Sequence, residues 1–488
     1  MPEIARHRTA LIRSDLSRPV RLALDDGIIT GDTTVMDYGC GHGGDIDRLH
    51  ARGFDCVGWD PNHRQSGARR RSGVVNLGYV INVIEDVAER DEALRAAWAL
   101  AEQVLVVAAR LKADLGESEP GEAFADGRLT RLQTFQKFYD QRELRAWIDS
   151  VLQTPCVAAA PGVFYVFRSE ARREAHLAAR MRRVIAAPRV SGRQELLQTH
   201  RGAFEELRTF LADRGRLPAS DELPEYDELV AAAGNINRAF RALEAASDAG
   251  AWESVKNARS QDLAIYLALA RFDRRPNLSN LSLAMQRDVR AFFGSYVAAC
   301  KAADALLFSL GAPGAIDAAC RAATVGKLMP TALYLHRSAL SDAPVSLRLF
   351  EGCARAYYGA IDGANVIKLS RVEPKVTYLS YPDFDTDPHP ALRWSVSVNM
   401  QTFRSKQRSY AVDGNAPILH RKELFVASSY PLRDKFKRLT ESEERWGLYD
   451  DPSTIGFAHG WAETLRARGV ELRGHRVVRL ALRAMPEA

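Results

Sequence analysis

Three alternating glycines, Gly39, Gly41 and Gly43, follow a short apolar run that contains an acid, Asp37. The run "TTVMDYG" predicts a strand, and "GGDIDRLHARG" predicts a helix with apolar residues on one face. Because glycine has no side chain, a ligand can approach the main chain closely at the turn between them. A second predicted strand, "FDCVGWD", ends in Asp60. This order indicates one half of a doubly wound sheet with a ligand at the carboxyl ends of its strands.

Two classes of cofactor fit the glycine loop. Gly39, Gly41 and Gly44 complete the GxGxxG pattern of dinucleotide sites, whereas Gly39, Gly41 and Gly43 complete the DxGxGxG pattern typical of S-adenosylmethionine (SAM) enzymes. A carboxylate at Asp37 would repel the pyrophosphate of NAD and attract the ammonium and sulfonium of SAM. A glycine-rich turn without any ligand is the alternative. We predict SAM as the cofactor, bound by Asp37, Gly39, Cys40, Gly41, Gly43 and Asp60, with Asp60 on the ribose hydroxyls.

Further strands and helices follow up to about residue 170. Strands are predicted from Val74 to Val80, in "QVLVVAA" and in "GVFYVFRS", and "FQKFYDQRELRAWIDSVL" predicts an amphipathic helix. An additional helix, marked by Val20 and Leu22, is predicted to lie across the sheet. Together these elements predict an α/β fold with a Rossmann-like, seven-stranded class I methyltransferase sheet in residues 1–170.

The methyl acceptor is expected near Asn76 and Tyr79. Methyl transfer needs the nucleophile about 3 Å from the methyl group, in line with the bond that breaks. Enzymes that methylate exocyclic amines of bases carry a (D/N/S)PP(Y/F/W) loop, and the equivalent place here reads Asn76-Leu77-Gly78-Tyr79, without the prolines. We predict Asn76 and Tyr79 as catalytic residues. The alternative is that Asn76 caps a strand end and Tyr79 packs on a helix; Asn82 is a weaker candidate on the same segment.

The rest of the chain divides into two predicted domains. Residues 171–335 are rich in helix formers and are expected to form an all-helical linker or substrate domain. Its arginine-rich start could bind a nucleic-acid backbone or form a solvated, ion-paired linker. Strand patterns return in residues 336–488, which predicts a small α+β C-terminal domain.

An acidic loop in this last domain raises the possibility of a metal. Asp383, Asp385, Asp387 and His389 alternate between prolines, and oxygen ligands of this kind suit Mg²⁺ or Ca²⁺. Asp and Pro are equally typical of plain turns, and the spacing completes no known calcium loop, so we assign no metal ligands. The segment "HRKELFV", which begins at His420, could meet this loop as a second site.

Composition limits the environment and the partners. The net charge of +6 permits a polyanionic partner without requiring one. The six cysteines contain no CxxC pair, which favours reduced thiols over a disulfide framework or a zinc site. No run of about 18 apolar residues occurs, and the charged N-terminal stretch lacks the apolar core of a secretory signal. We therefore expect a cytoplasmic protein that does not associate with membranes.

Five stretches carry a resemblance to a known family. They are "DYGCGHGGD", "GWDPN", "VVNLGYVINVIED", "YLSYPDFDTDPHPAL" and "HRKELFV". With these stretches the chain resembles the DNA phosphorothioation-associated methyltransferase family over nearly its whole length. The family is found beside bacterial DNA modification and restriction systems. The resemblance implies SAM-dependent methylation, DNA as a partner and other proteins of such a system as further partners.

The sequence thus predicts a SAM-dependent methyltransferase that acts on DNA. Two other functions remain open at this point, namely a non-catalytic SAM-binding regulator of nucleic acids and a metal-dependent nuclease in the C-terminal domain. RNA and small molecules also remain open as methyl acceptors.

Overall fold

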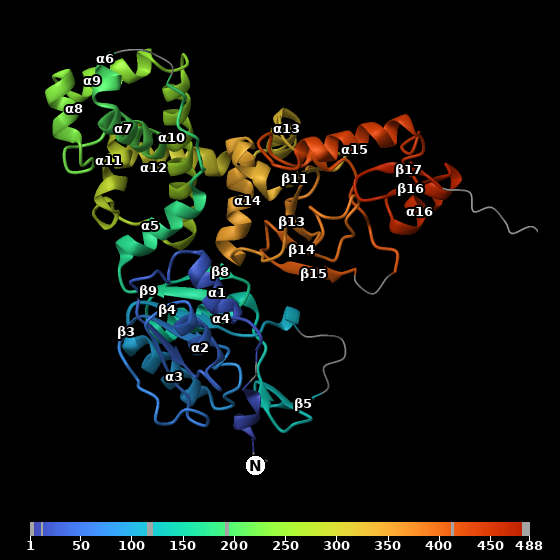
Figure 1. Cartoon of the computed structure of the whole chain (residues 1–488). Helices are drawn as coiled ribbons and strands as arrows, with labels where there is room; N and C mark the ends of the chain where they lie inside the picture. Colours follow the sequence, from blue (N-terminus) through green and yellow to red (C-terminus); the bar gives the residue numbers. More distant parts are fainter. Residues whose placement is uncertain (1–3, 11–12, 115–120, 191–194, 411–413, 481–488) are drawn as a thin grey trace, which may run out of the picture. The chain divides into compact units, whose positions relative to one another are not determined.

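The computed structural model describes residues 4–10, 13–114, 121–190, 195–410 and 414–480 (Figure 1). The chain divides into two compact units, each of which is described by itself. The N-terminal unit consists of Met1–Arg173 and Ala354–Asp362, and the C-terminal unit consists of Glu174–Cys353 and Gly363–Ala488. The boundary predicted near residue 170 lies close to this division, whereas the boundary predicted at residue 335 falls inside the C-terminal unit.

A six-stranded sheet forms the centre of the N-terminal unit, in the order β2-β1-β3-β4-β9-β8. The strands are β1 (Val35–Tyr38), β2 (Cys56–Trp59), β3 (Ser72–Gly78), β4 (Ala101–Ala108), β8 (Cys156–Ala160) and β9 (Val163–Phe167). The first four are parallel, and β9 runs antiparallel to both β4 and β8. This mixed sheet fits the α/β fold of class I methyltransferases.

The predicted count of seven strands is wrong by one. Residues 61–71, between β2 and β3, form turns and no strand. Their sequence, "PNHRQSGARRR", is polar and lacks the alternating apolar residues that a strand needs to bury one face. The sheet therefore ends at β2 on this side.

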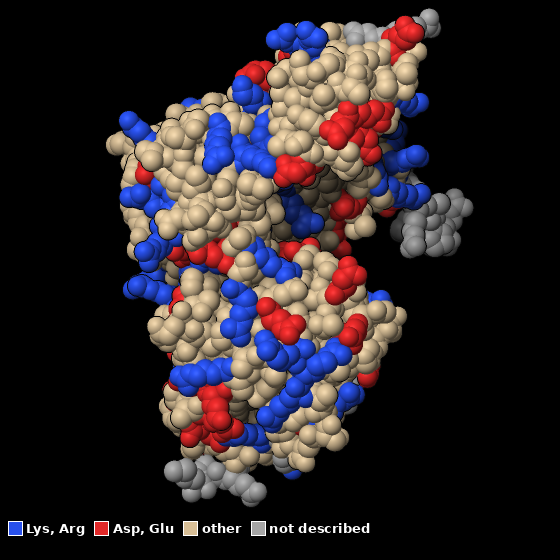
Figure 2. All heavy atoms as spheres, turned by 90° about the vertical axis from the view of Figure 1, so that its left-hand side faces the viewer, with Lys and Arg blue, Asp and Glu red and all other residues tan. Residues whose placement is uncertain are grey.

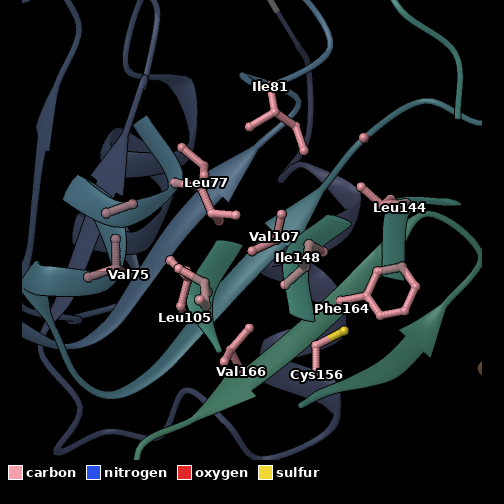
Figure 3. Packing of buried hydrophobic residues seen from close by; sticks show 14 of the residues in the cluster. Val75, Leu77, Ile81, Leu105, Val107, Leu144, Ile148, Cys156, Phe164 and Val166 are labelled. Atoms are coloured by element: carbon pink, nitrogen blue, oxygen red, sulfur yellow. The ribbon is translucent and has the colours of Figure 1, made fainter. Parts of the chain in front are cut away.

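Helices cover the sheet and complete the core. They are α1 (Arg18–Asp25), α2 (Gly44–Ala51), α3 (Val87–Leu100) and α4 (Gln141–Leu152). Figure 3 shows how Leu77 and Val107 of the sheet lie with Leu144 and Ile148 of α4 in one fully buried cluster. Cys156 is completely buried in the same cluster. The predicted helix across the sheet is α1, which contacts β3 and β4.

A second, three-stranded sheet lies between β4 and α4 in the sequence and was not predicted. It consists of β5 (Gly121–Phe124), β6 (Gly127–Thr130) and β7 (Phe135–Gln136), all antiparallel. The Asp126-Gly127 pair is a hairpin signal that could have revealed it. Asp126 also anchors this sheet, because its carboxylate accepts hydrogen bonds from the buried Arg90 at 2.9 and 3.0 Å.

The C-terminal unit begins with helices and ends with a second six-stranded sheet and further helices. The helices that precede the sheet are α5 (Glu170–Met181, which starts in the N-terminal unit), α6 (Glu195–Thr199), α7 (Arg201–Arg214), α8 (Tyr226–Ala233), α9 (Ile236–Ala245), α10 (Ala251–Leu269), α11 (Leu283–Phe293), α12 (Tyr296–Ser309) and α13 (Ala315–Ala322). Among the described residues no single helix is long and apolar enough to cross a membrane, and α11 with α12 passes that test only as a pair bent by 74°.

The sheet of the C-terminal unit is antiparallel in the order β10-β11-β12-β13-β14-β15. Its strands are β10 (Lys327–Leu328), β11 (Ala332–His336), β12 (Val366–Ser370), β13 (Lys375–Ser380), β14 (Trp394–Asn399) and β15 (Ser405–Ser409). The other elements are α14 (Val345–Tyr358), α15 (Arg433–Arg445), α16 (Ala458–Ala467), β16 (Val470–Leu472) and β17 (Val477–Arg479).

The arginine-rich segment after α5 forms ion pairs inside the C-terminal unit. Arg182 pairs with Asp213 at 3.2 Å, and Arg183 pairs with the buried Asp262 at 2.7 Å. Arg348 reaches the same carboxylate at 2.7 Å. These contacts favour the ion-paired alternative over a nucleic-acid helix for Arg182 and Arg183. Figure 2 likewise shows basic and acidic side chains intermingled on the face that it displays.

Candidate cofactor and acceptor site

A cavity of about 1060 Å³ lies in the N-terminal unit at the carboxyl ends of its parallel strands. Residues that follow β1, β2, β3 and β4 line one part of it. The N-terminal segment around the 3₁₀ turn η1 (Arg6–Thr9) and the β5–β7 sheet line the rest. This is the position in which open α/β sheets bind their ligands, and the volume suits a cofactor together with part of a second molecule.

The glycine loop between β1 and α2 borders this cavity. Gly39 has φ +85°, a left-handed conformation that residues with a side chain rarely adopt. A Cβ atom at Gly39 would also lie 2.3 Å from Cγ2 of Val80, so no side chain fits there. The loop is therefore close-packed against the residues that follow β3, and its bare backbone forms a wall of the cavity.

Most amide groups of the loop already have partners within the protein. The amides of Gly39 and Cys40 both donate to the carbonyl oxygen of Trp59, at 2.8 and 3.1 Å. The amide of Gly41 donates to Oδ2 of Asp60 at 3.0 Å. Dinucleotide sites instead direct such amides at a pyrophosphate. The geometry of this loop thus disfavours a phosphate-bearing cofactor.

The start of α2 carries negative charge of its own. Asp45 and Asp47 occupy the first turn of the helix, where the helix dipole attracts anions. Asp45 accepts a hydrogen bond from the amide of Ser17 at 2.7 Å, and Asp47 lies 3.6 Å from Arg64. The predicted cofactor residue Gly43 precedes this turn as a left-handed cap and does not line the cavity. These carboxylates further disfavour a pyrophosphate at this helix.

Asp60 presents a fixed carboxylate to the cavity. Its Oδ1 atom accepts hydrogen bonds from the amides of Asn62 and His63, both at 2.9 Å, and its Oδ2 atom accepts one from Gly41. The residue is only 9% exposed and lines the cavity. An ionised carboxylate has about four lone-pair positions, so Asp60 keeps capacity for a hydroxyl donor. This position fits the predicted contact with ribose hydroxyls.

Asp37 lies behind the cavity wall, which corrects its predicted role. It is 7% exposed and is not among the residues that line the cavity. Its Oδ1 atom accepts a hydrogen bond from Nδ2 of Asn76 at 2.8 Å. Burial, together with the nearby charge of Asp45, raises the pKa of Asp37 to about 7. Asp37 therefore supports the loop from behind, and its charge varies with pH near neutrality.

This raised pKa predicts a pH-dependent stability. Between the usual carboxyl pKa of about 4 and about 7, the folded state holds a proton on Asp37 that the unfolded state has lost. The contribution of Asp37 to the free energy of unfolding is therefore greatest below pH about 4. It decreases as the pH rises to about 7, by a few kcal/mol at most. We expect Asp37→Asn to flatten this part of the stability curve, measured by urea unfolding from pH 5 to 8.

Asp55→Asn is the matched control for this measurement, because Asp55 is 59% exposed and belongs to the same region of the fold. Its curve should follow that of the wild-type protein. Equal pH dependence in wild type and Asp37→Asn would contradict the assignment.

Tyr79 lies on the cavity, and Asn76 does not. Tyr79 follows β3 with φ +62°, donates its amide to the carbonyl oxygen of Ala108 and lines the cavity. Burial raises the pKa of its phenol, which keeps the hydroxyl protonated. Asn76 donates a hydrogen bond to the buried Asp37 and does not line the cavity, so it does not face an acceptor as predicted. Asn82, and not Asn76, lines the cavity, and its Nδ2 atom donates a hydrogen bond to Oε1 of Gln136 at 3.1 Å.

Cys40 lines the cavity as a neutral thiol. Burial and the nearby carboxylates of Asp37 and Asp60 raise the pKa of Cys40 to about 12. A thiolate nucleophile needs a lowered pKa, so Cys40 is a wall residue. Of the predicted cofactor residues, the cavity is thus lined by Gly39, Cys40, Gly41 and Asp60.

Three arginines from separate segments of the chain border the cavity. Arg8, Arg13 and Arg131 line the cavity, and none of them makes a salt bridge to a carboxylate within the described part of the chain. Arg13 lies over the ring of Tyr79, 5.5 Å from its centroid. These residues come from segments far apart in the sequence, so only the fold brings them together.

Arg6 anchors the N-terminal segment beside this cavity. Its guanidinium binds Glu85 at 2.7 and 2.9 Å and also pairs with Glu89. Burial opposes ionisation of Glu85, but the hydrogen bond from Arg6, a main-chain hydrogen bond and the charge of Arg6 together lower the pKa of Glu85. The segment around η1 is therefore held in place as one wall of the cavity.

The acidic loop of the C-terminal unit is held by internal contacts. Nε2 of His389 lies 2.6 Å from Oε1 of the buried Glu443, and Asp385 accepts a hydrogen bond from the hydroxyl of Tyr430 at 2.6 Å. As predicted, the loop meets the segment that begins at His420, because Nζ of Lys422 donates to the carbonyl oxygen of Asp387. Among the residues that the structure describes, no three His, Cys, Asp or Glu side chains are placed to hold a metal ion.

No family model matches the sequence, and no curated protein matches it. Among solved structures, the sugar N-methyltransferase KedS8 from Streptoalloteichus sp ATCC 53650 aligns with 31% of this chain and 84% of its own, at 13% identity and a TM-score of 0.25. The 1,6-didemethyltoxoflavin-N1-methyltransferase of Burkholderia thailandensis, with bound S-adenosylhomocysteine, aligns with 33% of this chain and 78% of its own, at 14% identity and a TM-score of 0.22. An O-methyltransferase family protein of the same organism aligns with 31% and 57%, at 15% identity and a TM-score of 0.22. Likeness at this level identifies neither an activity nor a substrate.

Proposed function

We propose that this chain is a SAM-dependent methyltransferase that acts on DNA. The observation that carries the proposal is the engagement of the loop amides. Gly39 and Cys40 donate to Trp59, and Gly41 donates to Asp60, so these donors are directed away from a phosphate. SAM carries no phosphate, and its ribose hydroxyls and ammonium need acceptors such as Asp60.

The residues that line the cavity fit this cofactor. Asp60 would hold the ribose hydroxyls, and the bare backbone of Gly39 and Gly41, with Cys40, would form the wall against which the cofactor lies. When bound, SAM supplies an activated methyl group for transfer to a nucleophile. Asp37 supports the loop from behind the wall, where its carboxyl group binds Asn76.

Positioning of the acceptor falls to residues after β3. Tyr79 offers an aromatic ring and a protonated hydroxyl, and Asn82 with Gln136 forms a hydrogen-bonded amide pair on the same cavity. Most of the acceleration in a methyl transfer comes from placing the nucleophile in line. Tyr79 and Asn82 are therefore the residues that we propose to orient the acceptor.

The arginines around the cavity support an anionic acceptor. Arg8, Arg13 and Arg131 are free to neutralise phosphates, which dominate the affinity of proteins for nucleic acids. The sequence resemblance to a family that accompanies DNA modification systems favours DNA among such acceptors.

Transfer of labelled methyl groups from SAM to plasmid DNA tests this proposal. We expect labelled DNA with the wild-type protein, with phosphorothioated and plain plasmids compared side by side and tRNA as a parallel substrate. The variant Asp60→Ala should give much less label at the same SAM concentration, because it lacks the proposed ribose ligand. Label in tRNA alone would contradict DNA as the acceptor, and tight SAM binding without any labelled product would favour a regulator.

A further inference from the structure

One face of the antiparallel sheet in the C-terminal unit carries a straight row of polar side chains. Lys368 on β12 pairs with Thr377 on β13, which pairs with Ser397 on β14, which pairs with Lys406 on β15. Because cross-strand partners point to the same side of a sheet, these four side chains share one face. Beyond Lys368 the row continues to Tyr334 on β11, and Nζ of Lys368 lies 5.2 Å from the centroid of that ring. Thr377 is buried, and the hydroxyl of Ser397 donates to the carbonyl oxygen of Lys406, so the two lysines are the groups of these four that can meet a ligand.

The strands of this region are strongly basic. Strands β12 to β15, with the turns at residues 371–374 and 400–404, contain six basic residues and one acid. The basic residues are Lys368, Arg371, Lys375, Arg404, Lys406 and Arg408. The acid, Glu373, pairs with Lys375 at 2.5 Å, and Arg371 pairs with Asp317 at 2.6 Å. Lys406, Arg404 and Arg408 are exposed and make no salt bridge within the described part of the chain.

Other parts of the C-terminal unit cover the opposite face of the sheet and one end of the face that carries the row. On the opposite face, the hydroxyl of Tyr378 donates to Oε1 of Glu351 on α14 at 2.9 Å. On the row's own face, Val366 and Leu379 pack in a buried cluster with Phe425. The positions toward Lys375, Asn399 and Arg404 stay at least partly exposed. The row therefore borders an open, basic surface.

We propose that this basic sheet face, made by Lys368, Lys375, Arg404 and Lys406, binds the phosphate backbone of DNA. Neighbouring strands lie about 4.8 Å apart, so Lys368 and Lys406 are separated by roughly 14 Å. Cations spaced across a sheet suit a line of phosphates, and such contacts position a protein on DNA without reading its sequence.

The composition of the face argues against an anionic membrane as its partner. Proteins that lie on membranes combine basic residues with several large apolar side chains that enter the lipid. On these strands and turns, Val372 is the large apolar residue with high exposure, at 68%. The face therefore offers positive charge with little to insert into a lipid surface.

This inference is independent of the proposed methyl transfer, because binding of DNA to this face needs neither SAM nor the cavity. The test is fluorescence anisotropy of the full-length protein with a labelled duplex of about 20 base pairs, without SAM, over a series of salt concentrations. We expect Lys406→Gln to weaken binding roughly threefold to tenfold and to lower the slope of log K against log salt by about one. The double variant with Lys368→Gln should lower the slope by about two.

Gln407→Glu is the matched control. It also lowers the charge by one on the same strand, but Gln407 is directed to the opposite side of the sheet from Lys406. Its affinity and slope should stay close to those of the wild-type protein. Wild-type slopes in the lysine variants, or equal losses in Gln407→Glu, would overturn the proposal. Tighter binding to phosphatidylserine vesicles than to DNA, lost in Lys406→Gln, would assign the face to membranes and overturn it as well.

Discussion

Replacing Asp60 by Ala is expected to weaken the binding of SAM or S-adenosylhomocysteine roughly 100-fold, about 2.7 kcal/mol. The change removes the carboxylate that lines the cavity and leaves the amides of Gly41, Asn62 and His63 without their acceptor. The loss thus combines a missing ribose ligand with a loosened loop. Isothermal titration calorimetry of both proteins measures it.

Two further variants separate these contributions. Asp60→Asn keeps an oxygen that can accept hydrogen bonds but removes the charge, so its affinity should fall between wild type and Asp60→Ala. Asp55→Ala changes an exposed acid that pairs with Arg70, and it should bind the cofactor as the wild-type protein does. Wild-type affinity in a folded Asp60→Ala protein would remove Asp60 from the site.

Gly39→Ala is expected to abolish cofactor binding and to lower stability by about 2–4 kcal/mol. The new methyl group would meet Val80 at 2.3 Å, and the backbone would keep a left-handed conformation at φ +85°. The loop would have to move to relieve the contact with Val80 or the backbone strain. Because the loop forms a wall of the cavity, this movement would disturb the cofactor site. Thermal unfolding and calorimetric titration of the variant check both effects.

Gly53→Ala is the control for this prediction. Gly53 has nearly the same φ, +84°, but no atom lies within 4 Å of the Cβ position. This variant should lose about 1 kcal/mol from backbone strain and keep full cofactor affinity. The double variant Gly39→Ala/Val80→Ala should recover part of the stability. Equal behaviour of Gly39→Ala and Gly53→Ala would show that close packing of the loop is unimportant.

The glycine loop and Asp60, which line one part of the cavity, could be predicted from local sequence signals. The apolar run before Gly39 and the strand that ends in Asp60 could be recognised from types and spacing, because both lie within one strand-loop-helix-strand unit. Parallel pairing of β1 with β2 then brings Gly41 and Asp60 into contact.

The other half of the cavity depends on contacts that no local pattern contains. Whether Asn76 or Asn82 faces the cavity depends on the path of the chain after Gly78, where Tyr79 takes a left-handed conformation. Arg8 and Arg131 meet only because the N-terminal segment and the β5–β7 sheet border the same cavity. The periodicity of apolar residues identifies helices and strands, but it does not show which distant segments form the same wall of the cavity.

The charge of Asp37 depends on its burial, which the sequence does not give. Its place before the glycine loop suggested a charged group in contact with the cofactor. Burial instead places it behind the wall and raises its pKa to about 7, so its charge is partly lost at neutral pH. The engaged loop amides, together with Asp45 and Asp47 at the start of α2, therefore disfavour a phosphate-bearing cofactor, whereas Asp37 does not contribute directly.

The central claim is that the cavity beside Gly39 and Asp60 accepts SAM and rejects dinucleotides. Calorimetric titration of the full-length wild-type protein with S-adenosylhomocysteine and, separately, with NADH tests it most directly. We predict saturable heat with a 1:1 stoichiometry for S-adenosylhomocysteine and none for NADH. Saturable binding of NADH, with no heat from S-adenosylhomocysteine, would contradict the account.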